Sequence, residues 1–213
     1  MNAPALRVVS NDNVDPALSL VLPAEEFIRA LRCVSPWAST DTTRPHLNGV
    51  LVESVVGAGV RVVATNGHAL AKYTLLSSGP AFKALIPLDA VAATLKARPK
   101  SGDIVVTSSS ISWLASHVFG APVHQGGSVT FAVSGETFPP YLKVIPDYSA
   151  EDRLFVGSIG ACAEYIEKIG KSFRLLPVQK GEPGMKITFG PSELDPMVFE
   201  VPDFLIVLMP QRL

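Results

Sequence analysis

The residue types that most often carry chemistry are sparse in this chain, and their spacing does not favour catalysis. The two cysteines, Cys33 and Cys162, form no Cys-x-x-Cys pair and lie in apolar helical patterns, which indicates reduced, buried thiols. His68 has no second His, Cys or carboxylate at metal-ligand spacing, and no Ser-His-Asp arrangement is evident. The sequence also has no phosphate-binding glycine loop and no paired catalytic carboxylates. It therefore predicts a binding protein that is not an enzyme and needs no cofactor or metal.

Chemistry of another kind, the binding of phosphate groups, is indicated by basic side chains on three predicted helices. Contacts of this kind address phosphate groups without reading the sequence of a nucleic acid, and such binding would fall steeply with salt. Lysine and arginine near a helix C-terminus also complement the helix dipole, so capping and solubility are the alternative interpretation. The net charge of −1 argues against a protein that coats nucleic acid through overall basicity. The candidate DNA-facing residues are Arg29, Arg32, Lys96, Arg98, Lys100, Lys168 and Lys171.

The first of these helices belongs to a strand-helix-strand pattern that begins near Ala17. Leu18, Leu20 and Leu22 alternate as in a half-buried strand, and Pro23 then suits the first turn of a helix. That helix is predicted over Pro23 to Ser35, with one apolar face formed by Phe27, Ile28, Leu31 and Val34. Three strand-like runs follow, at Gly49 to Val56, Val60 to Thr65 and His68 to Leu76.

The same order of elements recurs twice, and a repeat constrains the architecture more than any single element does. The second copy has a strand at Phe82 to Ile86, a helix opened by Pro87, and strands at Ile104 to Thr107, Ile111 to Val118 and Val129 to Val133. The third copy has a strand at Leu154 to Gly157 and a helix over about Ile159 to Lys171, with the stripe Ile159, Cys162, Ile166 and Ile169. Its later strands are predicted at Lys186 to Phe189, Met197 to Val201 and Phe204 to Met209.

The repeat predicts an α+β fold in which each unit is a sheet covered on one face by one helix. The first two units, residues 17–147, would pair as one layered domain after a flexible leader over residues 1–16. The third unit, residues 151–213, has no partner unit in the chain and would leave a sheet edge or an apolar face uncovered. The sequence therefore predicts self-association.

One stretch of the sequence resembles the start of the middle domain of bacterial DNA polymerase III beta subunits, the sliding clamps. Residues 39–71 read STDTTRPHLNGVLVESVVGAGVRVVATNGHALA. Asn66 replaces the usual Asp but is still a turn-forming residue beside Gly67, so the tight turn is expected to survive. Ala69 replaces the usual Arg, a loss of charge that is expected to weaken a partner or DNA contact. The matching positions are Arg44, Pro45, Leu47, Asn48, Gly49, Thr65, Gly67, His68 and Leu70.

Two further windows resemble the same family. Residues 135–146 read GETFPPYLKVIP and are similar to the linker after the family's middle domain. Residues 187–213 read ITFGPSELDPMVFEVPDFLIVLMPQRL and resemble the family's C-terminal strands and closing Met-Pro-x-Arg-Leu. The resemblance spans roughly Ala17 to Leu213. It implies a DNA-clamp fold of about three βαβββ units, without the family's first domain and without the first unit of its last domain.

The resemblance implies a hydrophobic groove that binds short peptides of partner proteins. An apolar cleft with a pliable Met suits such anchors. For Leu70, Leu194 and Val207, ordinary core packing is an equally good interpretation. Carried over by position, the groove residues are Thr65, Gly67, His68, Leu70, Pro146, Leu194, Pro196, Val207 and Met209.

Two functions remain in competition. The first is a DNA sliding clamp that tethers a DNA polymerase or a repair protein to duplex DNA, in a ring closed by oligomerisation. Family rings contain twelve units, so four chains of three units would supply the same number and a tetramer is favoured over a dimer. The second is a regulatory or decoy homologue that binds clamp-binding peptides without encircling DNA. Whether a clamp loader acts on the protein is left open.

The sequence gives no sign of a membrane segment or of export. No uninterrupted apolar run approaches the roughly 18 to 20 residues that span a bilayer. Residues 1–15 have one basic residue, Arg7, and lack the apolar stretch of a secretory signal. We therefore expect a cytoplasmic protein.

Overall fold

The structure is a computed structural model that describes most of the chain. The predicted leader, Arg98, Lys100 and the strand predicted at Leu154 to Gly157 lie outside the described residues. The described residues are 19–97, 101–113, 116–118, 121–124, 126–148, 159–177 and 184–212.

The first unit has the predicted order of one strand, one helix and three strands. Pro23 ends the first strand with φ −57°, close to the helical value, so the helix can start at the next residue. Glu25 and Glu26 lie in the first turn of that helix and Arg32 in the last, as its dipole favours. The elements are β1 (Ser19–Pro23), α1 (Ala24–Val34), β2 (Gly49–Ser54), β3 (Val60–Thr65) and β4 (Ala69–Leu75), with short 3-10 helices η2 (Ser35–Trp37) and η3 (Pro45–Leu47).

The second unit repeats the order of strand, helix and strands, but one predicted strand is wrong. The run Ile111 to Val118 is not a single strand, because β7 ends at Trp113 and β8 pairs instead with a strand that the sequence did not predict, β9. These two form a separate ribbon. The last strand ends at Thr130, three residues before the predicted end. The elements are β5 (Phe82–Pro87), α2 (Leu88–Ala97), β6 (Asp103–Thr107), β7 (Ser110–Trp113), β8 (Ser116–Val118), β9 (Ala121–His124) and β10 (Gly127–Thr130).

The third unit corrects the predicted helix. The helix begins at Ala163, not near Ile159, and Ile166 is 46% exposed although Ile169 is buried. The packed face carries Tyr165 and Phe173 instead, because aromatic rings of the first unit and of the last strand lie against it: Tyr165 stacks on Trp37, and Phe173 meets Phe204 edge-on. The elements are α3 (Ala163–Phe173), β11 (Lys186–Thr188), β12 (Met197–Val201) and β13 (Phe204–Leu208), preceded by the 3-10 helix η4 (Tyr141–Val144).

The first two units exchange their leading strands. β1 pairs with β6 in a four-stranded sheet of order β1-β6-β7-β10, and β5 pairs with β2 in a seven-stranded sheet. Each sheet is therefore completed by a strand from the other unit. The third unit extends the seven-stranded sheet, of order β11-β12-β13-β4-β3-β2-β5, because β13 pairs antiparallel with β4. This sheet crosses the predicted domain boundary, so the division into residues 17–147 and 151–213 stays a prediction.

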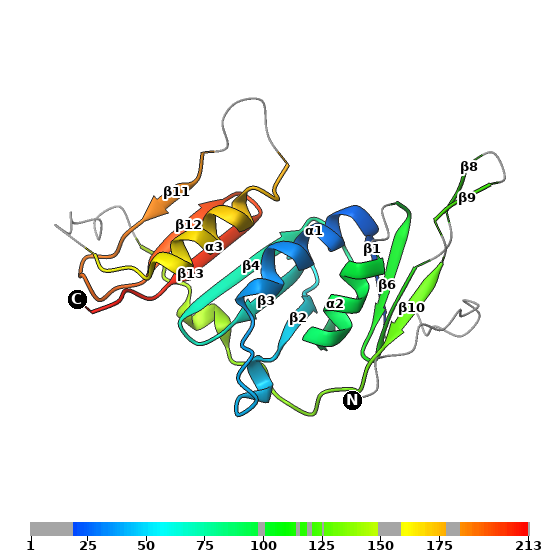
Figure 1. The fold of residues 1–213 in the computed structure, drawn as a ribbon, viewed down its shortest axis with the longest axis horizontal. Coiled ribbons are helices and arrows are strands. Elements are labelled where there is room, and N and C mark those ends of the chain that lie inside the picture. The colour runs from blue at the N-terminus through cyan, green and yellow to red at the C-terminus, as the bar shows by residue number, and fades with distance from the viewer. Residues whose placement is uncertain are drawn as a thin grey trace.

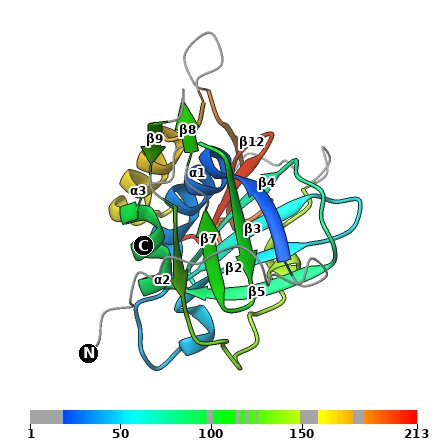
Figure 2. The ribbon, with the colours of Figure 1, turned by 90° about the vertical axis from the view of Figure 1, so that its right-hand side faces the viewer.

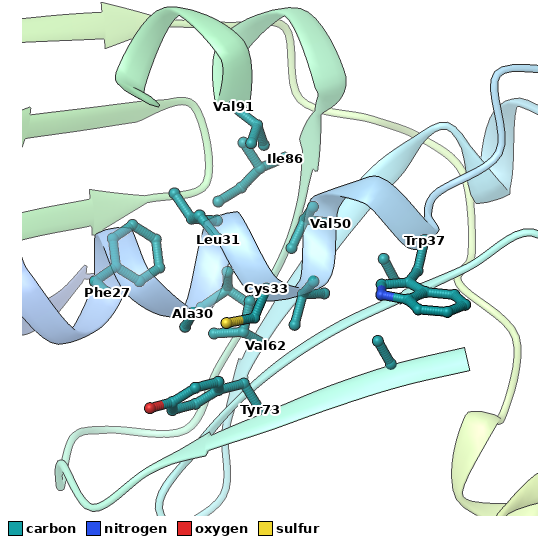
Figure 3. Close-up of a cluster of buried hydrophobic side chains, with 14 of the residues drawn as sticks. Phe27, Ala30, Leu31, Cys33, Trp37, Val50, Val62, Tyr73, Ile86 and Val91 are labelled. Carbon is teal, nitrogen blue, oxygen red and sulfur yellow. The ribbon is translucent and has the colours of Figure 1, made fainter. Parts of the chain in front are cut away.

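All three helices lie on one side of the sheets (Figures 1 and 2). The main core fills the space between these layers, with Phe27, Leu31 and Trp37 fully buried against the sheet strands (Figure 3). A smaller core lies on the opposite face of the seven-stranded sheet, where Phe138 and Tyr141 of the segment 131–148 cover it. The fold is α+β, and the predicted repeat is confirmed for the described elements.

The two cysteines are expected to react very differently with thiol reagents. Burial raises the pKa of the Cys33 thiol to about 12, and its Sγ donates to the carbonyl of Ser172 at 3.6 Å. Cys162 is only half-buried. Because the thiolate is the reactive form, Ellman's reagent at pH 8 is expected to label Cys162 in the native protein and Cys33 only after unfolding. The Cys162→Ser variant is the control: rapid labelling of its native form would contradict the packing of α1.

Candidate functional site

A cavity of about 360 Å³ lies between the first unit, the end of the last strand, and η4 with the two prolines that precede it. We call it the groove. Its floor is buried, since Leu70 and Val207 are each 3% exposed, whereas Val144 and Met209 are about half exposed at its rim. An apolar floor with a mobile thioether at the rim suits the docking of apolar side chains. The lining residues are His46, Leu47, Thr65, Gly67, His68, Ala69, Leu70, Pro139, Pro140, Tyr141, Lys143, Val144, Val207 and Met209.

The tight turn between β3 and β4 forms one wall of the groove. Asn66 Oδ1 accepts hydrogen bonds from the backbone N–H groups of His68 and Ala69, both at 3.0 Å. Thr65 Oγ1 donates to the Ala69 carbonyl at 2.7 Å. Gly67 has φ +90°, a backbone conformation that residues with a Cβ atom rarely adopt. The prediction that Asn66 preserves this turn is confirmed.

Asn66→Ala is expected to lower the free energy of unfolding by about 1–3 kcal/mol, because two backbone donors lose their acceptor. The variant also removes the hydrogen bond from Asn66 Nδ2 to the Tyr165 hydroxyl at 3.0 Å. Asn66→Asp is the matched control, since a carboxylate can accept from the same two N–H groups. Urea unfolding measures both variants. Equal losses for Ala and Asp would contradict the role assigned to the Asn66 oxygen.

The last strand forms the opposite wall. Val207 lies opposite Leu70 in the β13–β4 pairing, and the backbone N–H of Met209 donates to the His68 carbonyl at 3.0 Å. The groove therefore exists only because the third unit joins the sheet of the first. His68 itself is exposed, at the solvent end of this contact.

Residues 138–144, which line one side of the groove, are anchored to the sheet face that lies away from the helices. Phe138 packs edge-on against Tyr141. The Tyr141 hydroxyl donates to Glu53, which is also paired with Arg61 at 3.4 Å. Burial, followed by the neighbouring Glu53, raises the pKa of Tyr141 above its usual range, so the phenol stays protonated and keeps donating. This anchor holds residues 139–144 at the rim.

Six of the nine groove residues predicted from the sequence line this cavity, namely Thr65, Gly67, His68, Leu70, Val207 and Met209. Pro146, Leu194 and Pro196 are not among its lining residues. Leu194 is half exposed in the turn before β12, and the Pro196 carbonyl accepts from the Tyr148 hydroxyl. The lining residues that sequence reasoning missed lie within two of the windows that signalled the site. They are His46, Leu47 and Ala69 in the first window, and Pro139, Pro140, Tyr141, Lys143 and Val144 in the second.

The candidate DNA-facing residues that the structure describes all lie on the helical layer, but several of them already have partners. Arg29 pairs with Glu25 and Lys171 with Glu167, each at 2.7 Å. Lys168 Nζ donates to the Pro36 carbonyl at 3.2 Å and lies 5.4 Å from the centre of the Trp37 ring. Arg32 and Lys96 occupy the last turns of α1 and α2 and have no ion pair within the described residues.

Across the part of the chain that the structure describes, no group of three or more His, Cys, Asp or Glu side chains is placed to hold a metal ion. No helix among these residues is long and apolar enough to cross a membrane.

Comparison with known proteins gives a consistent answer at the level of the fold. No protein-family model and no curated protein matches the sequence. Among solved structures, a DnaN sliding clamp (DNA polymerase III subunit beta) from Pseudomonas aeruginosa matches with a TM-score of 0.70 and 15% identity, over 97% of this chain and 68% of the clamp.

Clamps from two other bacteria agree with this match. The Thermotoga maritima beta subunit has a TM-score of 0.67 at 15% identity, over 95% of this chain and 68% of its own. The Caulobacter crescentus beta subunit has a TM-score of 0.69 at 20% identity, over 97% and 69%. The chain therefore has the α+β fold of a bacterial DNA polymerase III beta sliding clamp, in a form that matches about two thirds of a clamp chain.

Proposed function

We propose that the protein is a DNA clamp that tethers a partner protein to duplex DNA, without catalysis, in a ring closed by oligomerisation. The observation that carries this proposal is the groove between β4 and β13, which combines an apolar floor, a half-exposed methionine and a tyrosine-anchored rim. A DNA polymerase or a repair protein with a short apolar peptide is the partner that this groove suits. Duplex DNA would contact the helical layer, and oligomerisation would close the ring.

The helical layer supports the DNA side of the proposal. Its three helices lie on the same face of the sheets (Figure 2), so their basic side chains can act on one duplex. Arg32 and Lys96 lie at helix C-terminal ends, where long cationic side chains can reach phosphates without disturbing the core. Contacts of this kind are independent of DNA sequence.

A charge at the groove rim is expected to weaken peptide binding by at least tenfold. Met209 is 48% exposed, so Met209→Glu leaves the core intact but places a carboxylate where an apolar anchor must be desolvated. Binding of a fluorescent peptide with leucine and phenylalanine anchors is measured by anisotropy. Leu76→Glu is the matched control, because Leu76 is 88% exposed after β4 and does not line the groove. Equal affinity of both variants would contradict the assigned groove.

The second function, a regulatory homologue that binds clamp-binding peptides without encircling DNA, is favoured by one observation. The third unit has an open edge at β11 within the described residues, so these residues do not complete a second clamp domain. Both functions predict peptide binding. Retention on closed circular DNA separates them, because only a ring needs a DNA end in order to leave.

A further inference from the structure

Each of the first two units receives a strand and a covering helix from the other, and the described residues give the third unit neither of these. In those units the strand that follows the helix is flanked by the leading strand of the other unit, β2 by β5 and β6 by β1. The corresponding strand of the third unit is β11. Among the described residues β11 pairs only with β12, at the end of the seven-stranded sheet. Within the described residues its other edge has no pairing strand, and a protein normally covers the backbone donors and acceptors of such an edge.

The side of β11 that faces the helical layer is apolar and exposed. Ile187 lies opposite Phe199, which belongs to the main core, so Met185, Ile187 and Phe189 share the helix side of the strand. These three side chains are 38%, 42% and 42% exposed. The outer face of the same strand is polar, with Lys186 paired to Glu200. The apolar side is thus the one that needs cover.

In the first two units, the apolar residues of the strand that corresponds to β11 are covered by a helix. Val50 and Val52 on β2, and Ile104 and Val106 on β6, are all 0% exposed. Each pair is covered by the helix of the other unit, since α2 packs on β2 and α1 packs on β6. The third unit has its own helix, α3, but no helix of the described chain occupies the place that α2 or α1 takes over these strands. Ile166 of α3 is also 46% exposed.

We propose that the open edge and the apolar side of β11 bind the third unit of a second copy of this chain. We infer a second third unit as the binding partner because the first two units show that two units of this kind complete each other's sheet and core. Two third units related by a two-fold axis present the same surface to each other, so the contact closes as a dimer and does not propagate into a filament. The inference rests on the proposed function in one respect: it names the contact that closes part of the ring.

The test is the native mass measured by light scattering after size exclusion, from about 1 to 100 μM protein. The wild type is expected to exceed the mass of one chain, 22.6 kDa, by an integral factor of at least two. Ile187→Asp and Phe189→Asp are expected to raise the dissociation constant of the β11 contact at least about 100-fold, because each buries a carboxylate in an apolar contact. Both positions are already exposed, so the fold of the protomer tolerates the change. Val56→Asp is the matched control, since Val56 is 77% exposed in the turn after β2.

Three outcomes are decisive. Dissociation by both β11 variants, with assembly kept by Val56→Asp, supports the contact. A monomeric wild type at every concentration overturns it, and so does an assembly whose mass the β11 variants leave unchanged. Peptide binding at the groove is measured on the same samples, because its loss in an intact assembly would count against the proposed tethering function and not against the β11 contact.

Discussion

Trp37→Ala is expected to lower the free energy of unfolding by about 3–5 kcal/mol, the range for removing a large aromatic side chain from a core. Trp37 is fully buried between the first and third units. Its ring stacks on Tyr165 with centroids 6.1 Å apart, and its Nε1–H donates to Ser172 Oγ at 3.1 Å. The substitution therefore removes packing area and a hydrogen bond at the point where α3 meets η2.

Urea unfolding followed by far-ultraviolet circular dichroism measures this effect. Trp37→Phe is the matched variant: it keeps a six-membered aromatic ring but loses the five-membered ring and its N–H donor, so a smaller loss of about 1–2 kcal/mol is expected. A loss below about 1 kcal/mol for Trp37→Ala would show that the third unit does not pack on α1 as described. Unfolding of the wild type in two separate transitions would likewise show that the third unit does not pack on the first.

The double variant Arg32→Gln, Lys96→Gln is expected to weaken DNA binding by about 10- to 100-fold at about 0.1 M salt. Both side chains lie on the helical layer, and neither has an ion pair within the described residues. If each neutralises one phosphate, the slope of log K against log salt should become shallower by about two. The affinity is measured by fluorescence anisotropy with a labelled duplex.

Lys83→Gln is the control for this loss of charge. Lys83 lies opposite Glu53 in the β5–β2 pairing, on the sheet face away from the helices. The control is expected to leave both the affinity and the salt slope nearly unchanged. If Lys83→Gln lowers the DNA affinity as much as Arg32→Gln or Lys96→Gln does, the binding reflects general electrostatic attraction to the protein. The helical layer is then not the contact surface.

The repeat of elements could be predicted from the sequence because its signals are local. Leu18, Leu20 and Leu22 alternate, Pro23 and Pro87 precede helices, and Gly67 follows a turn-forming Asn66. The reciprocal exchange of β1 and β5 could not be predicted in the same way, since it depends on which sheet edges meet after the chain has folded. The pairing of β13 with β4 is another contact of this kind.

Two of the departures from the predicted elements have identifiable causes. The run Ile111 to Val118 reads as one strand because its composition favours strand throughout, but β7, which ends at Trp113, pairs with β6 and β10, whereas β8, which begins at Ser116, pairs with β9. The sequence places Ile166 on the apolar stripe of α3 because it lies four residues after Cys162 and three before Ile169. Tyr165 occupies the packed face instead, since its ring stacks on Trp37, a contact across 128 positions that no local pattern reveals.

The groove could be predicted in part. Thr65 to Leu70 and Val207 to Met209 lie in windows whose residue order is specific, and the predicted residues within these two short stretches line the cavity, whereas Leu194 and Pro196 of the C-terminal window do not. The contribution of Tyr141 was missed because its role depends on Glu53 and Arg61, which lie far from it in the sequence.

Retention on circular DNA tests the central claim most directly. Protein is incubated with a nicked plasmid, with and without a loading activity from a bacterial extract, and bound protein is separated from free protein by gel filtration at about 0.15 M salt. A ring is expected to stay on the circle and to leave when the plasmid is cut once, because it slides off the new ends. The Arg32→Gln, Lys96→Gln variant should behave in the same way once loaded, since topology and not affinity holds a closed ring. Equal loss from circular and linear DNA under all conditions would contradict a clamp that encircles DNA, and would leave the peptide-binding regulator as the function of this fold.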